Sequence, residues 1–74
     1  MIEEMKWIHS KLTTEECMRI VLVRQNYEIH CDKTDLVGEF NGAFRIVRAN
    51  GRIVSINPDN VAMVCTISKR SVLL

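Results

Sequence analysis

The chain has few of the residues on which disulfide-rich, metal-binding and phosphate-loop proteins depend. Its 74 residues include three cysteines, two histidines, one proline and three glycines, and aromatic residues make up only 5%. The cysteines are odd in number, and no Cys-x-x-Cys pair or His-x-x-x-His spacing occurs, so we expect neither a disulfide framework nor a bound metal. The glycines form no phosphate-binding loop, and we expect no cofactor.

Long apolar runs are also missing, and we expect no secretory leader. No apolar stretch approaches the length of a membrane span, and residues 1–4 are acidic where a secretory leader would be basic. We therefore expect a cytoplasmic protein that does not bind membranes. Cys17, Cys31 and Cys65 are then reduced thiols that serve as small buried hydrophobic side chains.

Residues suited to catalysis are scarce. Only His9 and His30 could activate a nucleophile, and His30 adjoins Cys31 on a predicted strand, where neighbouring side chains point to opposite faces. Paired carboxylates occur at residues 3–4 and 15–16, where they favour a helix N-terminus. We expect no catalytic residue and no enzymatic activity.

Apolar residues, in contrast, are abundant and make up 47% of the chain. A chain of this length is near the lower limit for a self-sufficient core, so this surplus favours a homo-oligomer. The net charge of +1 is too small to attract the protein as a whole to DNA or to anionic lipid. The charges are unevenly distributed, because residues 1–40 carry a net charge of −3 and residues 41–74 a net charge of +4. This asymmetry is either ordinary surface scatter or a weak dipole that orients an anionic ligand or a neighbouring subunit.

The N-terminal third predicts a helix followed by strands. Apolar residues at helical spacing, Ile2, Met5, Ile8 and Leu12, predict a short amphipathic helix over residues 2–12. Residues 13–16 have the spacing of a capping box and could start one further helical turn. From Met18 the chain is rich in β-branched residues, and residues 18–31 form either one bent strand or two strands with a turn at Gln25-Asn26. A polar loop is expected at residues 32–35.

Two Asn-Gly pairs, at residues 41–42 and 50–51, predict consecutive two-residue hairpin turns of type I′. They separate three strands, over residues 36–40, 43–49 and 52–57. The turns set the register: Leu36 pairs with Val47, and Val47 with Val54. One face should hold Leu36, Phe40, Arg45, Val47, Arg52, Val54 and Ile56, and the other Val37, Glu39, Phe44, Ile46, Arg48, Ile53, Ser55 and Asn57. Both faces are largely apolar, so we expect both to be covered.

A break at residues 58–60 and a last strand over residues 61–67 complete the pattern. We expect a mainly β (α+β) domain with a short N-terminal helix and a five- to six-stranded antiparallel meander, forming a small barrel or a strongly bent sheet. Within this one domain, residues 1–17 are the helical segment that packs on the sheet, 18–67 the meander, and 68–74 a tail that is either frayed or docked on a neighbour. Residues 18–67 resemble the small barrels of SH3-like and Sm-like proteins, although the glycine signature of the Sm-like family is missing. In Sm-like proteins, edge strands of neighbouring subunits pair into rings, and the resemblance implies the same for this chain.

The candidate binding residues are Arg45, Arg48 and Arg52, which lie in a stretch without acidic residues. With Arg45 and Arg52 on one face, they could bind phosphate or stack on a base, or else protect a sheet edge or pair with Glu28 and Glu39. Three functions stay open. The first is a small non-enzymatic regulatory protein that acts as an oligomeric protein-interaction module. The others are an oligomeric RNA- or DNA-binding regulator and a pocket between subunits for an anionic small molecule such as a nucleotide.

Overall fold

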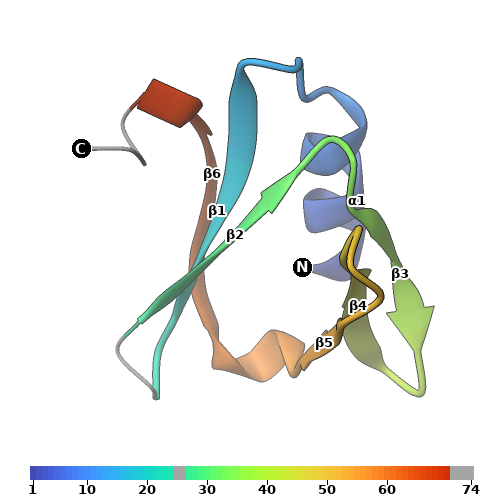
Figure 1. Cartoon of the computed structure of the whole chain (residues 1–74). Helices are drawn as coiled ribbons and strands as arrows, with labels where there is room; N and C mark the ends of the chain where they lie inside the picture. Colours follow the sequence, from blue (N-terminus) through green and yellow to red (C-terminus); the bar gives the residue numbers. More distant parts are fainter. Residues whose placement is uncertain (25–26, 71–74) are drawn as a thin grey trace.

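The described residues form one N-terminal helix and six antiparallel strands (Figure 1). The structure is a computed structural model, and it describes residues 1–24 and 27–70. The elements are α1 (Ile2–Ser10), β1 (Glu16–Leu22), β2 (Glu28–Asp32), β3 (Leu36–Phe40), β4 (Ala43–Val47), β5 (Ile53–Ile56), the 3₁₀ turn η1 (Pro58–Asn60) and β6 (Val61–Ser68). The prediction of a mainly β chain with an N-terminal helix is confirmed.

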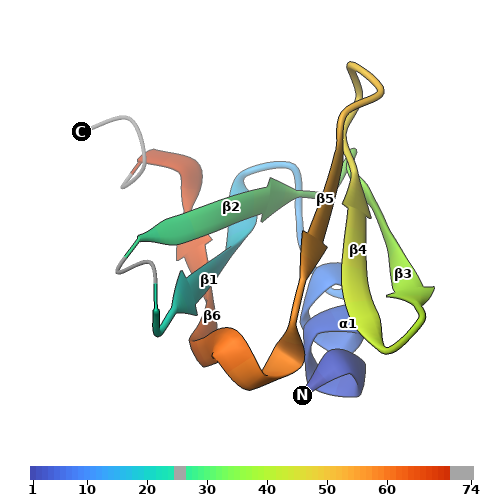
Figure 2. The ribbon, with the colours of Figure 1, turned by 90° about the horizontal axis from the view of Figure 1, so that it is seen from below.

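The strands form two three-stranded sheets, in the orders β2-β1-β6 and β3-β4-β5. The second is the predicted meander, and η1 leads the chain from its edge strand β5 back to β6 in the first sheet (Figure 2). No strand ladder between described residues joins the two sheets into a closed barrel. The barrel part of the prediction is therefore not confirmed.

Helix α1 lies between the two sheets and contributes to their common core (Figure 1). The predicted stripe is correct, because Met5 is fully buried while Ile2 and Ile8 pack against the core. The helix ends before Leu12, which is nevertheless buried. The buried side chains facing it come from both sheets and include Met18, Ile20, Ile29, Cys31, Phe44, Ile46 and Ile56.

The segment between the helix and β3 contains two strands rather than one. β1 pairs with β2 in antiparallel fashion, with Ile20 opposite Ile29. The predicted turn at Gln25-Asn26 lies outside the described residues. The capping-box residues form a single turn, in which the Thr13 N–H donates to Glu16 Oε1 at 3.1 Å, but the chain then enters β1 directly. The polar loop at residues 32–35 is present as predicted.

The first Asn-Gly pair forms the expected turn. Asn41 has a φ of 51° and Gly42 a φ of 80°, the pair of positive values that a type I′ turn needs. The predicted pairing of Leu36 with Val47 and of Phe40 with Ala43 is confirmed.

The second Asn-Gly pair does not form a two-residue turn, and this prediction was wrong. Gly51 has a φ of 87°, but Asn41 is the only non-glycine residue with positive φ in the described ranges, so Asn50 does not share that conformation. The Gly51 N–H donates to the Arg48 carbonyl at 2.9 Å, and the Arg48 N–H donates to the Arg52 carbonyl at 2.8 Å. These bonds define a three-residue loop closed by a glycine bulge.

The longer loop shifts the register of β5 by one residue. Val47 pairs with Ile53 and Ile46 with Val54, instead of Val47 with Val54. A shift of one residue moves every side chain of a strand to the other face of its sheet. Val54 and Ile56 therefore join Phe44 and Ile46 on the inner face, where they pack in the core or against it.

The end of the chain follows the prediction in part. The last strand, β6, runs one residue beyond its predicted end, and residues 71–74 of the expected tail lie outside the described residues. Within the described part of the chain, no helix has the length and apolar character needed to cross a membrane.

Candidate functional site

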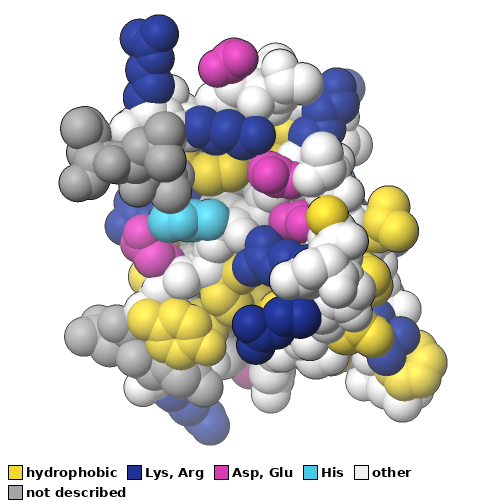
Figure 3. Space-filling view, in the orientation of Figure 1, with side chains coloured by type: hydrophobic (Ala, Val, Ile, Leu, Met, Phe, Trp, Pro, Cys, Tyr) yellow, Lys and Arg dark blue, Asp and Glu magenta, His cyan; other side chains and the backbone are white. Residues whose placement is uncertain are grey.

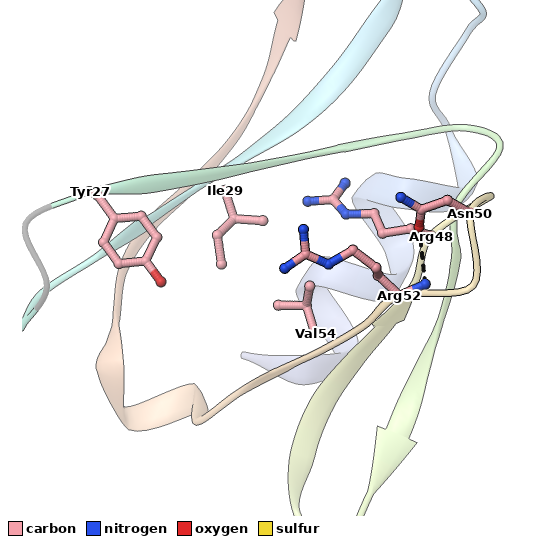
Figure 4. A pocket seen from close by; sticks show the side chains of 6 residues that line it. All are labelled: Tyr27, Ile29, Arg48, Asn50, Arg52 and Val54. Carbon is pink, nitrogen blue, oxygen red and sulfur yellow. Dashed lines mark hydrogen bonds between the residues drawn. The ribbon is translucent and has the colours of Figure 1, made fainter.

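A cleft opens between β2 and the hairpin that joins β4 to β5. It has a volume of about 320 Å³ and is lined by Tyr27, Ile29, Arg48, Asn50, Arg52 and Val54 (Figure 4). Strand β2 supplies one wall, and the other is formed by the hairpin loop and the first half of β5. On the same side of the molecule, basic side chains gather near the middle with hydrophobic side chains beside them (Figure 3).

Arg48 ties the hairpin to the open edge of β2. Its Nη1 donates to the His30 carbonyl at 2.6 Å and to Asp35 Oδ2 at 2.9 Å. Among the described residues, Asp35 is the only charged residue that is buried. Its Oδ2 also accepts a hydrogen bond from the Asp32 N–H at 3.1 Å. The guanidinium thus balances a buried carboxylate and satisfies a strand carbonyl, so its charge is already compensated within the fold.

Arg52 has a different position. It lies opposite Arg48 across the hairpin, and its backbone N–H donates to Asn50 Oδ1 at 3.0 Å. Its guanidinium has no hydrogen bond or ion pair to any described residue, and it points into the space between Ile29 and Val54 (Figure 4). Arg52 therefore supplies an uncompensated positive charge to the cleft.

The remaining lining is apolar and aromatic. Ile29 and Val54 form the inner surface between the two walls, and Tyr27 lies across the cleft from Arg52 (Figure 4). Tyr27 is 52% exposed, so it is open to a ligand. An aromatic ring facing a guanidinium across an apolar surface can bind a flat anionic molecule by stacking and hydrogen bonding together.

Arg45 lies on the outer face of the second sheet, away from the cleft. The predicted pairing of Arg45 and Arg52 on one face was wrong, because the shifted register places Arg52 with Arg48. The Arg45 guanidinium lies 4.3 Å from the centre of the Phe40 ring, and its Nε is buried without a hydrogen-bond partner in the described part of the chain. The alternative that these arginines pair with Glu28 or Glu39 is not found among the described residues, where Glu28 contacts Arg19 at 2.6 Å and His30 at 3.0 Å.

The outer face around Arg45 is largely apolar and open. Leu36, Phe40 and Ile53 are exposed by 69%, 54% and 55% of their surface. Val47 lies between Leu36 and Ile53 in the ladder and is half-buried. The expectation that both faces of this sheet are covered thus holds for the inner face alone within one chain.

The histidine and cysteine residues form no nucleophilic pair. His30 Nε2 lies 3.0 Å from Glu28 Oε1 on one face of β2, while Cys31 is fully buried on the other. Burial, assisted by the nearby Asp35 carboxylate, raises the pKa of the Cys31 thiol to about 12, so the thiol stays protonated. Cys17 is also buried, Cys65 is half-buried and all three cysteines are free. The described residues contain no group of histidine, cysteine and acidic side chains that could hold a metal ion.

Sequence reasoning missed four lining residues, Tyr27, Ile29, Asn50 and Val54, and it missed Asp35 as the partner of Arg48. The two walls of the cleft are more than 15 residues apart in the sequence, and no local pattern brings them together. The glycine-bulge hairpin decides which arginines enter the cleft, and its register depends on the core.

Comparisons with protein-family models, with curated proteins and with solved structures found no match for this chain.

Proposed function

We propose that this chain is a small non-enzymatic binding protein that acts as a homo-oligomeric protein-interaction module. The observation that carries the proposal is the open outer face of β3-β4-β5, where Leu36, Phe40 and Ile53 are each more than half exposed. Apolar residues gathered on one sheet face are typical of a surface that another chain covers. The described residues include eleven buried hydrophobic side chains, which is a small core, so an added subunit would stabilise the fold.

The sheet edges supply a route to self-association. Strands β5 and β6 are edge strands of different sheets, and each leaves backbone groups without a strand partner among the described residues. If β5 of one copy pairs with β6 of the next, a linear assembly has one unpaired β6 edge at one end and one unpaired β5 edge at the other. All of these edges are paired only when the assembly closes into a ring. In the Sm-like proteins that residues 18–67 resemble, a one-turn connection before the last strand lets edge strands pair into rings, and η1 occupies that place here.

The backbone of β5 indicates which substitution tests this pairing. The Arg48–Arg52 hydrogen bond starts an alternation in which Val54 and Ile56 bond to β4 while Ser55 directs its N–H away from β4. Proline at position 55 removes only this outward donor, and proline is tolerated on edge strands. Ser55→Ala is the matched control, because it removes the hydroxyl but keeps the N–H.

Light scattering after gel filtration tests the proposal directly. The parent and Ser55→Ala should have a mass of several times 8.5 kDa, and Ser55→Pro should have the monomer mass of 8.5 kDa. Ile53→Lys, which places a charge on the exposed face without touching the core, should also reduce the mass. A monomeric parent at high micromolar concentration would contradict the proposal.

The second function considered from the sequence, nucleic-acid binding by an Arg45–Arg52 face, loses its geometric basis. The two side chains lie on opposite faces of the sheet, and Arg48 is engaged with Asp35. Binding along a nucleic-acid strand depends on several uncompensated cations in a row. We therefore retain the protein-interaction function as the proposal.

A further inference from the structure

We infer that the cleft between β2 and the β4–β5 hairpin binds a small anionic ligand with a flat ring, of the nucleoside monophosphate class. All six lining residues belong to one chain, so this site does not depend on the proposed self-association.

The electrostatics of the cleft favour an anion. Arg48 is neutralised by Asp35 at 2.9 Å, whereas the Arg52 guanidinium faces the cleft with no partner among the described residues. Arg48 also fixes the hairpin against the His30 carbonyl, and its backbone N–H donates to the Arg52 carbonyl, so the backbone from which the Arg52 side chain extends is anchored. A guanidinium held beside apolar side chains binds phosphate or carboxylate through two parallel N–H donors.

The opposite wall favours a ring. Tyr27 lies at the far side of the apolar surface made by Ile29 and Val54, and about half of the residue is exposed. A flat ligand whose anionic group contacts Arg52 would lay its ring over this surface and against Tyr27. Asn50, at the closed end of the hairpin, adds an amide within the lining.

The dimensions of the cleft limit the size of the ligand. A volume of about 320 Å³ is at the lower end of the roughly 300–1,000 Å³ range of small-molecule sites. One uncompensated cation matches one phosphate group. These two limits fit a mononucleotide better than an oligonucleotide, which needs a row of cations.

Equilibrium dialysis of adenosine 5′-monophosphate against the full chain measures binding and tests the inference. We expect saturable binding of one molecule per chain, with adenosine and inorganic phosphate each bound at least about tenfold more weakly, because each lacks one of the two contacts. Comparable affinity for phosphate and the nucleotide would overturn the role of the ring. Binding of a short single-stranded oligonucleotide without binding of the nucleotide would overturn the assignment of a small ligand.

Matched arginine variants locate the site. Arg52→Gln should weaken binding of the nucleotide by about tenfold or more, and Arg52→Lys should restore part of the loss. Arg45→Gln removes the same charge from the opposite face of the sheet and should change the affinity by less than about twofold. Equal losses in Arg52→Gln and Arg45→Gln would overturn the assignment to the cleft. Arg52 is exposed, so its variants should fold, which a circular dichroism spectrum can verify.

Tyr27→Leu separates the two parts of the ligand. It should weaken binding of the nucleotide by about tenfold and leave the weak binding of inorganic phosphate unchanged. Unchanged binding of the nucleotide in this variant would overturn stacking on Tyr27. The same measurements on Ser55→Pro, the variant expected to be monomeric, distinguish this site from self-association, because its cleft should bind the nucleotide as the parent does.

Discussion

Arg48 Nη1 lies 2.9 Å from Asp35 Oδ2 and thereby connects the end of β4 to the corner between β2 and β3. The same nitrogen donates to the His30 carbonyl at 2.6 Å. No ladder joins the two sheets in the described ranges, so this ion pair, together with the core, holds the hairpin against β2. Arg52 lies opposite Arg48 across the hairpin and has the same charge, but its guanidinium makes no ion pair with a described residue. The two arginines are therefore a matched pair for experiment.

Replacement of Arg48 should destabilise the protein far more than replacement of Arg52. Arg48→Gln leaves the buried Asp35 carboxylate without its cation, and we expect a loss of about 2 kcal/mol in the free energy of unfolding, less than for a fully buried pair because Arg48 is partly exposed. Arg52→Gln should change that free energy by less than about 0.5 kcal/mol. Urea unfolding followed by circular dichroism measures both. Equal stabilities of the two variants would contradict the structural role of Arg48.

The two Asn-Gly hairpins show how far the sequence determines this fold. Identical dipeptides lead to different loops, because only Asn41 adopts positive φ. The second loop follows the core instead: the observed register places Val54 and Ile56 beside Phe44 and Ile46, while the predicted one would have turned them to the open face. Local turn chemistry predicted that a hairpin forms, but burial of the more apolar side of β5 decided its register.

The same reasoning explains what was predictable in the candidate site. The helix stripe and the strand positions follow from periodicity, and the structure confirms them. The arginines were identifiable from their acid-free surroundings. Which of them enter the cleft and which lie on the outer face was not, because that depends on the register. The placement of Tyr27 across the cleft from Arg52 depends on how the two sheets pack.

The glycine-bulge loop predicts a clear difference between two glycines. Gly51 has a φ of 87°, so Gly51→Ala forces a side chain into the left-handed region and should cost about 1 kcal/mol. Gly38 lies in β3 without positive φ, and a β-carbon added there has no atom within 4 Å. Gly38→Ala should therefore leave stability unchanged or raise it slightly. Thermal unfolding distinguishes them, since 1 kcal/mol corresponds to roughly 4–8 °C in a domain of this size. A similar Tm for both variants would contradict the loop geometry.

The two phenylalanines predict a second contrast. Phe44 is fully buried between the sheets, and Phe40 is 54% exposed on the outer face. Phe44→Ala should cost about 3–5 kcal/mol, enough to unfold much of so small a domain. Phe40→Ala should cost less than about 1 kcal/mol in the monomer, including the loss of its contact with Arg45. Denaturant unfolding at low protein concentration separates these effects from self-association, and a loss for Phe40→Ala as large as that for Phe44→Ala would contradict the placement of the core.

Acid should destabilise the fold through Asp32, at the corner between β2 and β3. The Thr34 hydroxyl donates to Asp32 Oδ1 at 2.6 Å and the Thr34 N–H at 2.9 Å, and the hydroxyl bond is the main reason that the pKa of Asp32 is lowered. A carboxyl with a lower pKa in the folded state binds protons more weakly than in the unfolded state, so protonation favours unfolding. Its stabilising contribution is present above the ordinary aspartate pKa, about 4, and is lost as the pH falls through the lowered value.

Two variants of Thr34 test this origin of acid sensitivity. Thr34→Val removes the hydroxyl donor, so the pKa of Asp32 moves back toward its ordinary value and the fall in Tm between about pH 5 and about pH 2 becomes smaller than in the parent. Thr34→Ser keeps the hydroxyl and should retain the slope of the parent. Glu28, whose pKa is lowered by its hydrogen bond to Arg19, contributes in the same direction in all three proteins and cancels in the comparison. Parallel Tm curves for Thr34→Val and Thr34→Ser would show that the acid sensitivity arises elsewhere, because the hydroxyl is the only hydrogen-bonding group that distinguishes the two side chains.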